Sequence, residues 1–117
     1  MSRLVPLGKS TEWVSFVTEN GAGILADPDA GPTVVNVQKN GSDSLESAVT
    51  IEQQEDDGPA NITGTFFAVF DLAALTVAPN DTISATISFQ MDGYIKTFPI
   101  DLTIGEFAVN EPKVRVG

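Results

Sequence analysis

Cysteine and histidine are absent from the 117 residues of this chain. Their absence excludes disulfides, thiolate chemistry, zinc sites of the usual Cys/His type and every mechanism that needs an imidazole base. A chain of this length buries enough surface to fold as one domain without a covalent staple. The composition therefore favours a binding or structural module over a catalyst.

Basic residues are scarce, because six lysines and arginines stand against sixteen aspartates and glutamates, for a net charge of −10. Two of the six lie in residues 1–11 and two in residues 112–117, and neither segment contains an acidic residue. The body between them sets sixteen carboxylates against two lysines, a net charge of −14. Because so negative a surface repels phosphate groups, we predict no nucleic-acid partner and no membrane partner.

Long apolar runs are also missing. No segment reaches the roughly 18 consecutive apolar residues that a membrane-spanning helix needs. The opening residues lack the apolar stretch of a secretory signal, so we expect none. Neither a G-x-S-x-G motif nor a phosphate-binding loop occurs, and we predict no catalytic residue and no cofactor.

What the sequence does contain is strand patterning. Apolar and polar residues alternate strictly through Thr82–Met91, which is typical of a strand with one buried face. Asp92-Gly93 follows and suits the two positive-φ positions of a type I′ turn, so we predict a hairpin returning through Tyr94–Ile104. Pro99 has no backbone N–H, which predicts an edge position or a bulge there.

Four further strands are predicted between turn-forming segments, and a single helical turn begins at Asp71, a good N-cap residue. The strands cover Glu12–Thr18, Thr33–Gln38, Ala48–Gln53 and Asn61–Phe70. No helix is long enough to cover a sheet. The pattern therefore predicts an all-β fold, an antiparallel two-sheet β-sandwich, with a small closed barrel as the alternative.

Two acidic clusters invite a cation hypothesis. Asp27 and Asp29 resemble the start of a calcium loop, but the fifth residue of such a loop is here Gly31 and the twelfth is Gln38. The run 55–57 consists of three carboxylates in a Gly-Pro loop. Turn formation and solubility explain both clusters, so we predict no metal site.

The strand Asn61–Phe70 is apolar on both faces. Alternation sends Phe66 and Phe70 to one face and Phe67 and Val69 to the other. Either another part of the chain covers the second face, or Phe67 and Val69 contact a partner. We therefore include both residues among the candidate interface residues.

Four motifs occur together in a recognisable order in the segment from Thr33 to Gly105 and the Pro32 that precedes it. They are Pro32-Thr33-Val34-Val35-Asn36-Val37, Gly64-Thr65-Phe66-Phe67, Leu72-Ala73-Ala74-Leu75, and Ile83 to Gly93 followed by Thr97-Phe98-Pro99. In this the chain resembles the immunoglobulin-like β-sandwich modules of tailed-bacteriophage virion proteins. The usual tyrosine of the second motif is phenylalanine here.

The resemblance implies a non-enzymatic structural protein of the virion, assembled in the cytoplasm of a bacterial host. We expect a capsid-associated cement or decoration subunit whose partners are the major capsid or other virion proteins and copies of itself. A tail, neck or baseplate component is the alternative, and so is a module that binds a glycan or receptor on the host surface.

The two ends complete the prediction. The sandwich is expected to span residues 12–105, with an N-terminal arm at residues 1–11 and an extended C-terminal segment at residues 106–117. Each end either closes the sandwich as an edge strand or leaves it as an arm that binds a neighbouring subunit. In the second case the basic residues of the arms meet the acidic bodies of neighbouring copies. The candidate interface residues in the arms are Arg3, Leu4, Val5, Leu7, Val114, Arg115 and Val116.

Overall fold

In the computed structural model, which describes residues 3–43, 46–55, 58 and 60–105, the alternating run and its return form one long hairpin. The strands β7 (Thr82–Met91) and β8 (Tyr94–Ile104) pair antiparallel without interruption along their length. At the turn, Asp92 has φ 53° and Gly93 has φ 81°, the two left-handed residues that a type I′ turn requires. The predicted hairpin is confirmed.

Replacing the second turn residue tests how strongly this turn specifies the hairpin. A Cβ at Gly93 meets no atom within 4 Å, so the penalty in Gly93→Val is conformational. We expect the free energy of unfolding to fall by about 1–2 kcal/mol, because a β-branched residue is strained at positive φ. Gly93→Asn is the control, since asparagine tolerates that conformation. Equal melting temperatures of Gly93→Val and the parent would contradict the prediction.

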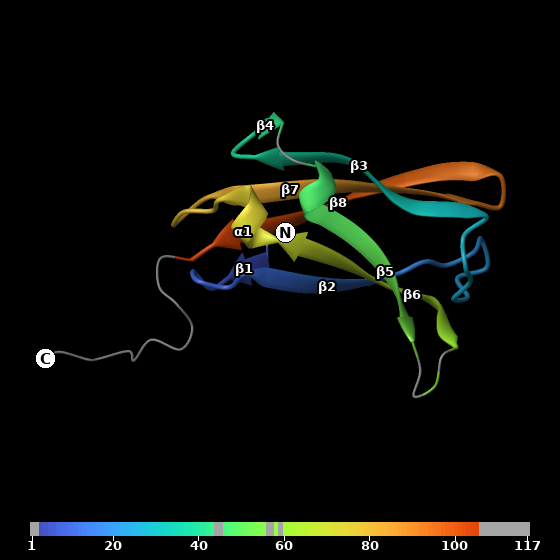
Figure 1. The fold of residues 1–117 in the computed structure, drawn as a ribbon. Coiled ribbons are helices and arrows are strands. Elements are labelled where there is room, and N and C mark those ends of the chain that lie inside the picture. The colour runs from blue at the N-terminus through green and yellow to red at the C-terminus, as the bar shows by residue number, and fades with distance from the viewer. Residues whose placement is uncertain (1–2, 44–45, 56–57, 59, 106–117) are drawn as a thin grey trace, which may run out of the picture.

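The strands form two sheets that pack face to face (Figure 1). The larger sheet has the order β1 (Arg3–Val5), β8, β7, β3 (Ala30–Lys39) and β4 (Ser42–Asp43). The smaller sheet has the order β2 (Thr11–Val17), β6 (Asn61–Asp71) and β5 (Val49–Glu55). A 3-10 turn, η1 (Glu46–Ala48), precedes β5. The predicted all-β sandwich is confirmed, and the closed barrel is not formed.

The order of the strands is that of an immunoglobulin-like sandwich. The strands β2, β6 and β5 occupy the places of strands B, E and D, and β3, β7 and β8 occupy those of C, F and G. All strand pairs are antiparallel except β1 with β8. The parallel strand β1 is therefore an edge strand of the larger sheet, next to β8.

A single helical turn carries the chain from the smaller sheet to the larger one. In α1 (Leu72–Leu75) the Asp71 side chain accepts a hydrogen bond from the backbone N–H of Ala74, as predicted for an N-cap. The Nζ of Lys39 donates to the carbonyl of Leu75 at 3.0 Å and satisfies the other end. Leu72 and Leu75 are buried. No helix in the described residues is long and apolar enough to cross a membrane.

The core lies between the sheets and consists of the inward residues of the alternating strands. In β7 every second residue from Ile83 to Met91 is buried, which confirms the face assigned from the sequence. The largest side chains that are completely buried are Phe70, Leu72, Ile83, Ile87, Leu102, Ile104, Val5 and Val37. Strands from both sheets, including the short edge strand β1, therefore contribute to one core.

Pro99 lies on an edge, which is one of the two positions predicted for it. Ile104 donates its backbone N–H to Asp81 on the β7 side, whereas Gly105 donates to Val5 on the β1 side. Backbone groups of odd-numbered β8 residues therefore face away from β7. Since β1 pairs only with Leu102–Ile104, the nitrogen of Pro99 faces a side with no strand among the described residues.

The first strand corrects the expectation of an N-terminal arm. Arg3–Val5 pair with Leu102–Ile104, and Val5 is completely buried in the core. The edge-strand alternative is therefore correct for this end, because an apolar side chain gains more from the core than from leaving the domain. Residues 106–117, the other predicted arm, lie outside the described residues.

Candidate binding surfaces

One end of the sandwich is built from the β7–β8 turn and the loop that joins β2 to β3 (Figure 1). The backbone N–H of Gly21 donates to the Asp92 carboxylate at 2.9 Å, and that of Gly93 donates to the Asp29 carboxylate at 3.4 Å. A backbone bond from Asp29 to the carbonyl of Gln90 adds a third link. Two segments about 70 residues apart in the sequence are thus held side by side.

The loop has its own internal framework around Asn20. The Asn20 side-chain oxygen accepts hydrogen bonds from the backbone N–H groups of Ala22 and Ile24, and the Asn20 backbone N–H donates to the carbonyl of Ile24. Glu19 and Leu25 form an isolated antiparallel bridge. The loop therefore presents Ile24 and Leu25 from an ordered turn.

Four large apolar side chains are exposed on these two segments. The exposed fractions are 62% for Ile24, 45% for Leu25, 73% for Tyr94 and 75% for Ile95. Three exposed carboxylates accompany them, on Glu19, Asp29 and Asp92. We call these seven residues the hairpin end. Exposed apolar side chains near charged ones are a common property of surfaces that bind another protein.

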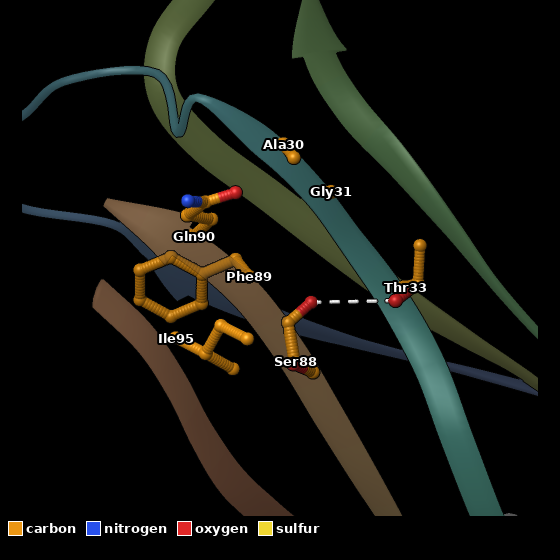
Figure 2. A pocket seen from close by; sticks show the side chains of 7 residues that line it. All are labelled: Ala30, Gly31, Thr33, Ser88, Phe89, Gln90 and Ile95. Carbon is orange, nitrogen blue, oxygen red and sulfur yellow. Dashed lines mark hydrogen bonds between the residues drawn. The ribbon is translucent and has the colours of Figure 1, made fainter. Parts of the chain in front are cut away.

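A shallow depression lies beside the hairpin end, between the start of β3 and the end of β7 (Figure 2). It is lined by Ala30, Gly31, Thr33, Ser88, Phe89, Gln90 and Ile95. The strand register shifts between Ala30 and Thr33, which opens this space. Its volume of about 210 Å³ is below the range of typical small-molecule sites, so it is better suited to part of a partner's side chain.

The outer face of the smaller sheet carries the predicted residues Phe67 and Val69. Both lie on the central strand β6 and are half-buried. The ring of Trp13 on β2 meets Phe67 edge-on, with centroids 5.5 Å apart and planes at 82°. Part of the cover on Phe67 thus comes from the chain itself, while 47% of Trp13 remains exposed.

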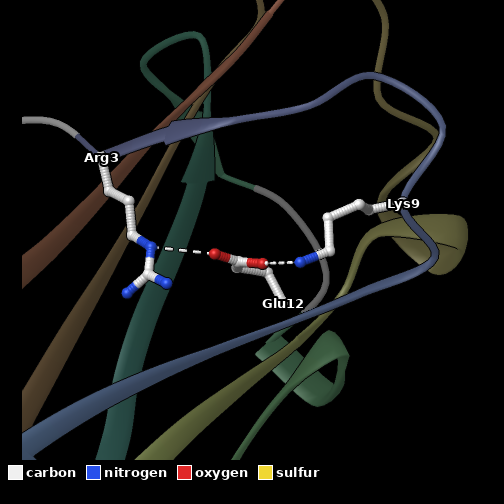
Figure 3. Close-up of polar contacts among 3 residues, drawn as sticks. All are labelled: Arg3, Lys9 and Glu12. Atoms are coloured by element: carbon white, nitrogen blue, oxygen red, sulfur yellow. Dashed lines mark hydrogen bonds and ion pairs between the residues drawn. The ribbon is translucent and has the colours of Figure 1, made fainter. Parts of the chain in front are cut away.

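The basic residues of the N-terminal segment bind within their own domain. Glu12 is only 4% exposed, and its carboxylate pairs with Arg3 at 2.8 Å and with Lys9 at 2.6 Å (Figure 3). Arg3 is thus already paired within its own domain, and its predicted contact with a neighbouring acidic subunit stays a prediction. Leu7 is half-buried against the core, whereas Leu4 is 70% exposed.

The acidic residues considered for cation binding make separate contacts in the fold. Asp27 accepts hydrogen bonds from the Gln53 side chain and from the backbone N–H of Gly64, each at 2.8 Å. Asp29 belongs to the hairpin end, and residues 56 and 57 lie outside the described residues. Within the described part of the chain, no three acidic side chains approach as a metal site would need.

Asp81 is a carboxyl group whose pKa the fold changes. The Asn40 side chain donates to it at 2.9 Å and the backbone N–H of Ala78 at 2.8 Å. These hydrogen bonds lower the pKa of Asp81, the Asn40 bond having the larger effect. The contacts tie the loop before β7 to the β3–β4 turn, so the role of Asp81 is structural.

The hairpin end was not among the predicted interface residues. Tyr94 and Ile95 follow the predicted turn directly, and this position could have indicated from the sequence that both are exposed. The predicted Val114, Arg115 and Val116 lie outside the described residues.

Comparisons of the chain with models of protein families, with curated proteins and with solved structures find no significant match.

Proposed function

We propose that this chain is a non-enzymatic structural protein of a tailed bacteriophage, a capsid-associated cement or decoration subunit. The hairpin end is the observation that carries the proposal. Four large apolar side chains there are 45–75% exposed, and hydrogen bonds to the backbone hold their two segments together. An ordered apolar surface binds a partner with little loss of conformational entropy.

The scaffold and the composition support the same proposal. The motifs that resemble phage sandwich modules lie on β3, β6, α1, β7 and β8, which form most of the two sheets. The absence of histidine and cysteine leaves few side chains for catalysis at neutral pH. In this role the hairpin end contacts a neighbouring virion protein, either a shell protein or another copy of the chain.

Two alternative functions remain for this protein. One is a tail, neck or baseplate component, and the other is a module that binds a glycan or receptor on the host surface. The half-exposed ring of Trp13 favours the glycan module, because sugars stack on exposed aromatic rings. Only one tryptophan is present, and Phe67 and Val69 of the neighbouring strand lie beside it. The hairpin end supplies more exposed apolar groups and favours a protein partner.

Quantitative mass spectrometry of purified particles of the virus that encodes the chain tests this proposal. We expect the chain in a fixed ratio to the major shell protein, and in the head fraction after heads and tails are separated. A chain found only with tails would support the tail alternative and contradict the capsid role. Absence of the chain from particles would contradict both.

A variant of the hairpin end then tests the docking surface. Particles that lack the chain are mixed with purified parent or with Ile95→Asp, and we expect Ile95→Asp to bind at least about tenfold more weakly. Ala73→Asp adds the same charge at an exposed position on α1, at the opposite end of the domain, and is expected to bind like the parent. Equal binding by both variants would exclude the hairpin end as the docking surface.

A further inference from the structure

The hairpin end has a chemistry that another part of the same chain complements. Its exposed residues Ile24, Leu25, Tyr94 and Ile95 are apolar or aromatic, and its three charged residues are acidic, whereas the exposed Lys96 directly after Ile95 is the one basic neighbour along the hairpin. A matching partner needs apolar side chains next to positive charge. In a chain with only six basic residues, few segments meet that requirement.

The last six residues of the C-terminal segment, 112–117, meet it, whereas Glu106 and Glu111 earlier in the segment are acidic. These six residues contain Lys113 and Arg115 and no acid, with Val114 and Val116 between and after them. In an extended conformation this alternation places both basic side chains on one face and both valines on the other. The segment lies outside the described residues, and its sequence alone supplies this chemistry.

The distance from the start of the segment to the hairpin end bears on whether the segment binds its own domain or a second copy of the chain. Gly105 follows β8, and the 11 residues of β8 separate it from the hairpin end by roughly 33 Å at about 3.3 Å per residue. Arg115 is ten residues beyond Gly105, so its reach is at most about 35 Å. The segment reaches its own hairpin end only when fully extended along the whole domain, whereas a second copy imposes no such limit.

We propose that residues 106–117 of one copy bind the hairpin end of the next copy, with Lys113 and Arg115 against the carboxylates and the valines against the apolar residues. The contact joins two different surfaces, so repeating it produces a ring or an open chain of subunits. This proposal rests on the proposed function, because it takes the hairpin end as a docking surface. It identifies the partner of that surface as a second copy of the chain.

Two complementary variants of the full chain test the head-to-tail contact. Ile95→Asp alters the hairpin end, and Lys113→Glu with Arg115→Glu alters the C-terminal segment. The mass of each protein is measured over a range of concentrations by light scattering, with circular dichroism as the check of folding. We expect the parent to associate with rising concentration, and each variant to do so at least about tenfold more weakly.

The mixture of the two variants is the decisive measurement. Each variant keeps one intact surface, so together they form one contact and stop at a pair of twice the 12.3 kDa chain mass. Ala73→Asp is the matched control and should associate like the parent. A monomeric parent, association of either variant at the strength of the parent, or a mixture that stays monomeric would overturn the proposal.

These outcomes are independent of the particle experiment. A parent that stays monomeric in solution yet occurs in particles in a fixed ratio would remove the copy-to-copy contact and leave the virion role intact. A parent that associates through both surfaces but is absent from particles would do the reverse.

Discussion

Gly64→Ala is expected to lower the free energy of unfolding by about 3–5 kcal/mol. Gly64 has φ 69°, a conformation that strains an L-residue. A Cβ there would lie 2.8 Å from the carbonyl oxygen of Thr18 and 2.9 Å from the nitrogen of Ala26. Both contacts are with backbone, which cannot move aside without breaking hydrogen bonds.

The hydrogen bonds at risk join the start of the β2–β3 loop to β6. Thr18 donates its backbone N–H to the Gly64 carbonyl at 2.8 Å, Gly64 donates to Asp27, and Ala26 donates to Thr18. Gly23→Ala is the matched control, since Gly23 has φ 77° but nothing within 4 Å of the added Cβ. It should lose only about 1 kcal/mol in urea unfolding. Equal losses in the two variants would contradict the steric explanation.

Removing both cations from Glu12 is expected to produce the second large effect. Arg3→Ala and Lys9→Ala should each cost less than about 1 kcal/mol, because both side chains are about half exposed and one ion pair remains. The double variant leaves a carboxylate that is 4% exposed without a cationic partner. We expect it to lose about 2–4 kcal/mol, more than the two single losses together.

A third substitution separates the buried charge from other effects. Glu12→Leu added to the double variant removes the carboxylate and places an apolar side chain in the same buried position. We expect at least half of the lost stability to return, measured by urea unfolding of all variants. Losses that simply add, or a triple variant no more stable than the double, would show that Glu12 does not depend on its two cations.

The hairpin and the helical turn were predictable because short segments specify them. Thr82–Met91 and Tyr94–Ile104 have the bounds read from the sequence, since strict alternation and an Asp-Gly turn act within a few residues. The N-cap at Asp71 also needs only its three following residues. The two-sheet architecture follows from the number of such strands and the lack of long helices.

Features that depend on distant residues were not predictable in this way. The strand β1 has only three residues, and its partner Leu102–Ile104 lies about 100 positions away. The cations bound to the buried Glu12 depend on that placement of β1, because Arg3 comes with the strand. The strand pattern places Glu12 on a strand but does not show what faces it.

The sequence by itself determined the all-β class, the strands with strong alternation, the turn at Asp92-Gly93 and the separation of charge between body and ends. The tertiary structure decided which apolar residues stay exposed and which charged residues are buried. Alternation assigns a side chain to one face of a strand, whereas burial depends on what packs against that face. At the hairpin end Tyr94 and Ile95 stay largely uncovered, and at the other end β1 supplies Val5 to the core and Arg3 to Glu12.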